Sequence, residues 1–270
     1  NEGHQVTIIG RDKDKLTAAA VEIGVAATDR LGKASEADIV IISVPVDNFE
    51  HVCGDLAPHI HERQQVFDLT SVKVMPVNAM HRYFTSARIL GIHPVFGPGA
   101  ESLNGQNVIL TPTNAAENEL TDKVSEWLSS RGVRVRITAP EEHDRLMSIS
   151  LGLAHFIAIV TADALVSLDK LTEMSGASGI TYKALLTLVE SVLSEDPTLY
   201  ASLQLNLPSL PEMEKLFGEK AADWAFIVKD GHRDEFISRM SALKTTLEGA
   251  NPDFGASYQK LYHLANRRQD

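Results

Sequence analysis

Residues 37–45 read Ala37-Asp38-Ile39-Val40-Ile41-Ile42-Ser43-Val44-Pro45, a β-branched apolar run that a proline ends. An unbroken apolar run of this length is typical of a strand that is covered on both faces in a parallel sheet. In open α/β sheets, ligands bind beyond the carboxyl ends of such strands. The stretch therefore indicates an α/β fold and marks one candidate edge for a binding site.

The same alternation of short apolar runs and helical stretches recurs on both sides of this strand. Further strands are predicted over residues 6–9, 65–68, 86–91, 108–112 and 133–138. The helices predicted between them cover residues 13–22, 49–56, 74–81 and 117–131. Strands that alternate with helices predict parallel βαβ units. We therefore expect a Rossmann-type, doubly wound parallel sheet that forms a dinucleotide-binding domain over residues 1–139.

The pattern changes at Pro140, after which no strand signal recurs. One long helical pattern covers residues 141–168, and others cover 181–193, 197–205, 211–217, 221–229 and 232–247. We therefore expect an all-helical domain over residues 140–270. At the other end of the chain, the strand at residues 6–9 corresponds to the second strand of a Rossmann fold. A first strand and glycine-rich loop of about 25–30 residues are then expected to precede it; the alternative is a chain that starts here.

Composition restricts the class of protein. The chain is 44% hydrophobic with a formal net charge of −11, so it lacks the basic surplus that non-specific nucleic-acid binding requires. Its single cysteine, Cys53, excludes an internal disulfide and fits a reducing compartment. We see no apolar run of the roughly 18–20 residues that a membrane helix needs. A cytoplasmic protein that binds neither nucleic acid nor membrane is expected, and no residue spacing typical of a metal site is found.

The end of the strand at residues 6–9, which corresponds to the second strand of a Rossmann fold, bears on the choice of cofactor. An NAD-binding Rossmann fold places a carboxylate there, which accepts hydrogen bonds from the ribose hydroxyl. Here the strand is followed by Gly10, Arg11 and Asp12. A small residue and a guanidinium suit the extra phosphate of NADP, so NADP is favoured and NAD is the alternative. Arg11 and Asp12 also fit a second interpretation, in which they only cap the next helix.

Two more strand ends carry candidate cofactor-binding residues. These are Ser43, Val44 and Pro45 after one strand, and Thr70 and Lys73 after the next. Lys73 has the alternative of being simply solvated. Ser71 has no glycine elbow around it, so it is interpreted as a hydrogen-bond partner and not as a nucleophile.

His93 is the candidate catalytic base. It lies in Gly91-Ile92-His93-Pro94-Val95-Phe96-Gly97-Pro98, where an apolar strand precedes it and a proline- and glycine-rich turn follows. A rigid turn of this kind presents a general base in a fixed position. In the helical domain, Ser148, Gly152 and His155 share one face at helical spacing and suggest ligand contact, although a packed core histidine explains them equally well. His143-Asp144 is interpreted as a capping turn.

Taken together, these motifs resemble the prephenate dehydrogenase family. The resemblance rests on Gly91–Pro98, on Thr70-Ser71-Val72-Lys73 before it, and on Gly105–Pro112 after it. In the helical domain it rests on His143-Asp144, on Leu153–Phe156 and on Glu195–Tyr200. Gly10-Arg11-Asp12 looks most like the archaeal members.

The resemblance implies an NADP-dependent oxidative decarboxylation of prephenate to 4-hydroxyphenylpyruvate, in tyrosine biosynthesis, by a homodimer built through the helical domain. His93 would take the proton of the ring hydroxyl, Ser71 would orient that hydroxyl or the imidazole, and His155, with Ser148, would line the substrate pocket. One departure stands out, because the arginine that binds a substrate carboxylate in the family is absent from residues 189–193. Lys183 is the substitute candidate, and arogenate becomes an alternative substrate.

Two other functions compete with this interpretation. A β-hydroxyacid dehydrogenase has the same two-domain plan but needs a lysine on the first long helix of the second domain, and none occurs between Arg145 and Lys170. A non-catalytic NADP-binding protein is the other, supported by the missing arginine and glycine loop.

Overall fold

The structure is a computed structural model that describes residues 3–97, 99–174 and 176–266. It divides into two compact units, residues 1–147 and 148–270. The predicted domain boundary at residues 139 and 140 falls at the first residue of α5 (Pro140–Met147). The second unit begins with Ser148.

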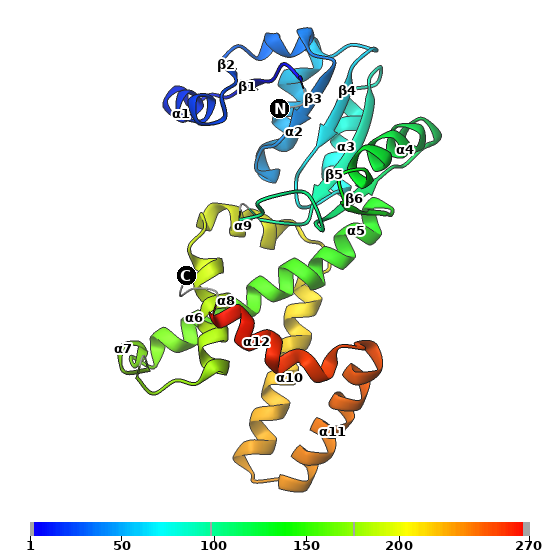
Figure 1. The fold of residues 1–270 in the computed structure, drawn as a ribbon. Coiled ribbons are helices and arrows are strands. Elements are labelled where there is room, and N and C mark those ends of the chain that lie inside the picture. The colour runs from blue at the N-terminus through cyan, green and yellow to red at the C-terminus, as the bar shows by residue number, and fades with distance from the viewer. Residues whose placement is uncertain (1–2, 98, 175, 267–270) are drawn as a thin grey trace. The chain divides into compact units, whose positions relative to one another are not determined.

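The first unit holds the strands and the helices that connect them (Figure 1). Its strands are β1 (Thr7–Ile9), β2 (Ala26–Thr28), β3 (Ile39–Ile42), β4 (Gln65–Asp68), β5 (Arg88–Pro94), β6 (Asn107–Thr111) and β7 (Arg134–Ile137). Its α-helices are α1 (Lys13–Ile23), α2 (Val46–Leu56), α3 (Val74–Tyr83), α4 (Ala115–Ser129) and α5. The predicted elements are confirmed to within a few residues, apart from the short strand β2, which the sequence did not suggest.

The strands form two sheets. β1 pairs with β2 in a parallel two-stranded sheet, and the other five lie in the order β3-β4-β5-β6-β7. All pairs are parallel except β5 with β6, which is antiparallel, so the prediction of parallel βαβ units throughout is wrong at this point. The cause is the connection over residues 95–106, whose described part contains no helix. A parallel neighbour needs a long crossover, whereas a direct return places the next strand antiparallel.

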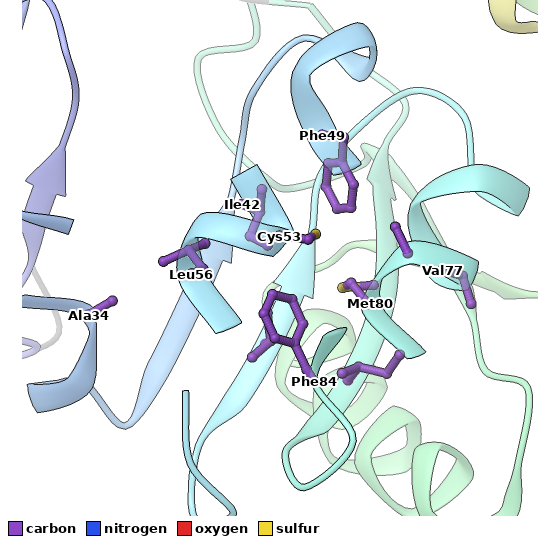
Figure 2. Close-up of a cluster of buried hydrophobic side chains, with 11 residues drawn as sticks. Ala34, Ile42, Phe49, Cys53, Leu56, Val77, Met80 and Phe84 are labelled. Carbon is purple, nitrogen blue, oxygen red and sulfur yellow. The ribbon is translucent and has the colours of Figure 1, made fainter. Parts of the chain in front are cut away.

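Side chains alternate between the two faces of the five-stranded sheet, so each face has its own core. Val66 and Ile89 face the cluster that Phe49, Cys53 and Met80 of α2 and α3 complete (Figure 2). The neighbouring Phe67 and Leu90 point to the opposite face, where Leu120 and Leu128 of α4 cover them. Helices on both faces make the doubly wound arrangement that the sequence predicted.

β3 lies at one edge of the five-stranded sheet. Ile39 and Ile41 of this strand are exposed by 46% and 56%, although the apolar run predicted a strand buried on both faces. Ile42, one residue further, is buried in the core beside α2. The first strand and glycine-rich loop that we expect before residue 1 stay a prediction.

The second unit is helical, as expected. Its helices are α6 (Ala154–Ser167), α7 (Leu171–Met174), α8 (Ile180–Leu193), α9 (Pro197–Asn206), α10 (Leu210–Lys229), α11 (Arg233–Ala250) and α12 (Ser257–Asn266). The two helices predicted over residues 211–217 and 221–229 form one, because Gly218 costs a helix only about 1 kcal/mol and does not end it.

Residues Pro140–Ser167 form one continuous helix, with a π-helical segment at Ser148–Leu153. Among the described residues it is the helix that is long and apolar enough to cross a membrane, judged by length and composition alone. Its most apolar part has a mean hydropathy of 1.9 and is 17% buried. Our expectation that no apolar stretch reaches this length is therefore wrong, although core helices of soluble proteins pass the same test.

Candidate active site

The end of β1 carries the residues that we assigned to the cofactor's ribose. Gly10 follows the strand, and a Cβ there would touch Leu16 of α1 at 3.4 Å, so the backbone lies close to the helix. Asp12 caps α1, since its Oδ1 accepts hydrogen bonds from the amides of Asp14 (3.2 Å) and Lys15 (3.1 Å). The carboxylate is thereby engaged with the helix, as the capping interpretation predicted.

Arg11 is exposed, and the described residues provide it with no ion-pair partner. The nearby Lys13 binds Asp29 at 3.0 Å. Arg11 therefore remains available to an anionic group at the end of β1.

The ends of β3 and β4 share one edge of the sheet, because these strands are parallel neighbours. After β3, Ser43 and Pro45 are exposed, and Val44 packs against the core beside α2. After β4, Thr70 is buried and its hydroxyl donates to the carbonyl of Val72 at 2.7 Å. These residues lie where a cofactor is expected, and Thr70 in addition closes the turn that leads into α3.

His93 lies within β5 itself, opposite Ile109 of β6, and not in the turn that follows the strand. The antiparallel pairing with β6 extends β5 through Pro94, which is why our placement of His93 after the strand is wrong. The side chain is 3% exposed. Gly91, two residues earlier, is required by close packing, since a Cβ there would overlap the side chains of Thr111 and Val77. Pro98 of the same motif lies outside the described residues.

A hydrogen-bonded chain begins at His93. Its Nδ1 lies 2.8 Å from Nε2 of His143, which extends from α5, and the ring centroids are 5.0 Å apart in an edge-on arrangement. Nδ1 of His143 lies 2.7 Å from Oδ1 of Asp144. Asp144 in turn accepts hydrogen bonds from the backbone amides of Lys73 (2.7 Å) and Val74 (3.0 Å). The sequence motif His143-Asp144 thus caps the start of α3, and not its own helix, and joins that helix to His93.

The ammonium of Lys73 is completely buried and forms an ion pair with Asp68 at the end of β4. The alternative that Lys73 is solvated is therefore wrong, and its buried ammonium is directed at Asp68 and not at the exposed edge. Ser71, two residues before Lys73 in the chain, is half-buried, and among the described residues no hydrogen bond joins Ser71 to His93.

The surroundings of His93 favour its neutral form. Burial lowers the pKa of His93 well below 6.5, and the neighbouring His143 and Lys73 lower it further. A neutral imidazole that is fixed at one nitrogen can accept a proton at the other. Within the described part of the chain, the hydrogen bond of His93 involves Nδ1, and Nε2 has no hydrogen-bond partner. A nitrogen in this state has the chemistry that a general base requires.

The substrate-binding candidates lie in the second unit. His155 of α6 stacks edge-on against Tyr200 of α9, with ring centroids 4.8 Å apart. Nδ1 of His155 and the hydroxyl of Tyr182 are buried without a hydrogen-bond partner among the described residues, and burial lowers the pKa of His155. Unpaired buried polar atoms are rare in folded proteins, and a water molecule or a bound polar ligand can supply the missing partner.

Ser148 and Gly152 are buried in the π-helical segment before α6, whereas His155 is only half-buried. At Gly152, a Cβ would press against Leu210 of α10 at 2.8 Å, so this position serves helix packing. The π-helical segment changes the register that we assumed for a single face. Lys183 is exposed on α8, next to Tyr182.

Comparison with known proteins gives matches along most of the chain. The family model "Prephenate dehydrogenase, nucleotide-binding domain" matches residues 1–137, and the model "Prephenate dehydrogenase, dimerization domain" matches residues 139–242. A "Probable arogenate/prephenate dehydrogenase" of Methanocaldococcus jannaschii is 33% identical over 244 residues, 89% of this chain and 55% of that protein. The "T-protein" of Enterobacter agglomerans is 29% identical over 86% of this chain and 61% of its own length. The chain thus spans little more than half the length of these curated relatives.

Solved structures show the same fold. The prephenate dehydrogenase of A. aeolicus, solved with hydroxyphenyl propionate and NAD+, has a TM-score of 0.77 at 19% identity and covers 93% of this chain and 90% of its own. The arogenate dehydrogenase of Synechocystis has a TM-score of 0.69 at 17% identity, with 92% of each chain covered.

Proposed function

The chain belongs to the prephenate dehydrogenase family, and on this premise we propose that it converts prephenate to 4-hydroxyphenylpyruvate and carbon dioxide, in tyrosine biosynthesis. The observation that carries the proposal is His93, a buried imidazole that is held at Nδ1 by His143 and has Nε2 unpaired within the described residues. NADP+ is proposed as the oxidant, with NAD+, which the A. aeolicus protein was solved with, as the alternative.

His93 supplies the proton transfers of this reaction. Its Nε2 accepts the proton of the ring 4-hydroxyl, which strengthens departure of hydride from the same carbon. The nicotinamide, when bound, accepts that hydride. Loss of the ring carboxylate as carbon dioxide makes the ring aromatic, and His93 returns its proton to the resulting phenolate. The proton is thus borrowed and returned, so one prephenate and one NADP+ give 4-hydroxyphenylpyruvate, carbon dioxide and NADPH.

Substrate binding is assigned to the second unit. We propose that His155 of α6 and Tyr182 of α8, whose buried Nδ1 and hydroxyl have no partner among the described residues, contact polar groups of the substrate. Lys183 is the proposed partner of a substrate carboxylate, because no arginine occurs at residues 189–193. Arogenate differs from prephenate in its side chain, and the M. jannaschii relative carries both substrates in its name.

A second copy of the chain is the proposed partner of the helical unit. Its apolar helix is little buried, and exposed apolar side chains recur on α8 at Leu185, Leu188 and Leu193. Apolar surface of this extent is typical of a protein interface. The family model that matches this unit is described as a dimerization domain.

An assay of the full-length protein tests the proposed function. Prephenate and arogenate are each supplied with NADP+ and with NAD+, and formation of the reduced nicotinamide is followed by absorbance. Turnover of prephenate, greatest with NADP+, supports the proposal as stated, and turnover of arogenate alone shifts it to the alternative substrate. Binding of a cofactor with turnover of neither substrate would contradict it and favour a non-catalytic NADP-binding protein.

Replacing Arg11 with alanine is expected to weaken NADP+ binding by about tenfold or more, because hydrogen bonds to charged groups contribute about 1.5–3 kcal/mol. NAD+ lacks the extra phosphate, so its affinity should hardly change. Calorimetry with each cofactor measures both. Arg88→Ala is the matched control, since Arg88 is also exposed and lies at the amino end of β5. An equal loss of affinity for both cofactors would show that Arg11 does not bind the extra phosphate of NADP+.

The pH dependence of kcat/KM should report the state of His93. The base is active when neutral, and burial lowers the pKa of His93 well below 6.5. The enzyme should therefore keep its activity as the pH falls past 6.5, and lose it only at lower pH, where His93 becomes protonated. Initial rates at low substrate across this range give the apparent pKa. An acid limb centred above 6.5 would argue against His93 in this environment.

A further inference from the structure

We propose that His143 and Asp144 are positioning residues that hold His93 in the tautomer with a proton on Nδ1 and a free electron pair on Nε2. This inference deepens the proposed function and rests on it, since His93 is the base of that reaction. The inference rests on the continuous chain of hydrogen bonds that runs from His93 through His143 to Asp144 and on to the backbone amides of Lys73 and Val74.

The direction of the chain is set at its far end. The amides of Lys73 and Val74 can only donate, so both carboxylate oxygens of Asp144 accept, at 2.7 and 3.0 Å. The oxygen that binds the Lys73 amide also lies 2.7 Å from Nδ1 of His143. An oxygen that already accepts from an amide favours a donor on its other side. Nδ1 of His143 therefore carries a proton.

The tautomer of His93 follows from that of His143. A neutral imidazole with a proton on Nδ1 has a bare nitrogen at Nε2, which accepts a hydrogen bond. Nε2 of His143 lies 2.8 Å from Nδ1 of His93, so His93 donates there. Its own Nε2 is then left with the electron pair. The opposite assignment needs a second proton on His143 and gives His93 an N–H at Nε2, which accepts nothing.

Charge counting favours the same arrangement. Asp68 and Lys73 form a pair whose charges sum to zero, whichever of the two holds the proton. Asp144 contributes one negative charge, and it is almost completely buried. The net charge of the cluster is therefore −1 while both histidines are neutral. A proton taken up by His93 makes the sum zero, so Asp144 stabilises the imidazolium through His143.

A purely structural role is the competing explanation, because Asp144 also caps α3. Loss of a cap costs about 0.5–2 kcal/mol of stability but does not alter the tautomer of a histidine on another element. The tautomer of His93 therefore separates the two explanations. It is measured without substrate, so it also stands apart from the outcome of the activity assay.

The experiment uses full-length protein labelled with 15N at histidine, with His93 assigned from the spectrum of His93→Asn. Ring 15N shifts distinguish a protonated nitrogen from a bare one. The variants are His143→Phe, which removes the acceptor, and Asp144→Asn, whose amide can donate to Nδ1 of His143 and reverse the chain. His51→Phe and Asp55→Asn are matched controls, because this exposed histidine–aspartate pair on α2 has a separation of 3.5 Å.

Wild-type His93 should show a bare Nε2, and both variants should lose this preference while the controls keep it. In the same variants kcat should fall by between tenfold and about 10⁴-fold, the upper figure being the effect of a wrong histidine tautomer in a serine protease. The acid limb of kcat/KM should also move. A bare Nδ1 in the wild type, or a tautomer that both variants leave unchanged, would overturn the inference. Correct tautomers without turnover of prephenate or arogenate would instead count against the proposed function.

Discussion

Replacement of His93 with asparagine is expected to lower kcat by about 10²- to 10⁴-fold, the usual contribution of a positioned general base. Asparagine is polar and smaller, so it fits the site, but it cannot take the proton of the ring hydroxyl at neutral pH. Because His93 lies within β5 and the cofactor candidates lie at other strand ends, the dissociation constant of NADP+ should change less than about twofold. Steady-state kinetics and calorimetry on the same preparation check both.

The control for this variant is His51→Asn. His51 lies on α2 in the same unit, is mostly exposed and pairs with Asp55 of its own helix. The His51→Asn variant should leave kcat unchanged, since this exposed side chain takes no part in the hydrogen-bonded chain of His93. Equal turnover in His93→Asn and the wild type would remove the base from the proposed mechanism. If kcat and the affinity for NADP+ fell together, the result would point instead to a role of His93 in cofactor binding.

The strands were predicted well because each is a short run of residues whose local pattern is typical of a strand. The unbroken apolar run at residues 39–42 and the strand at residues 65–68 are recognisable without knowledge of their neighbours. The direction of β6 could not be predicted from the sequence, because it depends on the connection at residues 95–106. No local propensity states whether such a connection crosses the sheet or turns back. For the same reason His93 was placed in a turn instead of a strand.

The candidate base was visible from the sequence, and its partners were not. His143 follows His93 by fifty positions and Asp144 follows Lys73 by 71, so only the fold brings them together. A His-Asp pair at the start of a helix is more often a cap, and here it does cap a helix, but a different one. The burial of Lys73 could not be predicted from the sequence, since lysine and aspartate residues are rarely buried and this pair, five residues apart, is typical of surface charge.

Lys73→Met is expected to destabilise the first unit by about 3–5 kcal/mol, because it leaves the buried carboxylate of Asp68 without its partner. Asp68→Asn/Lys73→Met should recover most of this loss, since the asparagine oxygen can still accept the amide of Thr70, which lies 2.7 Å from Asp68. Lys33→Met, which removes an exposed ion pair with Glu36, should cost no more than about 1 kcal/mol. The double variant shows how much of the loss comes from leaving Asp68 charged and unpaired, and Lys33→Met shows what the loss of an exposed cation costs.

The two tryptophans make the measurement specific to one unit. Trp127 lies on α4 in the first unit and Trp224 on α10 in the second. In a Trp224→Phe background, denaturant unfolding followed by fluorescence reports the first unit alone, which avoids treating two units as a single transition. A stability change in Lys73→Met no larger than that in Lys33→Met would contradict the buried ion pair.

The pH dependence of the Lys73→Met penalty follows from Asp68. Burial raises the pKa of Asp68 above its ordinary value of 3.8, and Lys73 opposes this rise in the wild type. Without Lys73 the folded protein must keep Asp68 protonated, whereas the unfolded chain releases that proton above about 3.8. The unfolded state therefore gains as the pH rises, and the penalty should be smallest near pH 4 and grow until the pH passes the raised pKa. Denaturation midpoints at acidic and neutral pH test this sign, and a penalty that is equal at both would mean that Asp68 stays ionised beside some other cation.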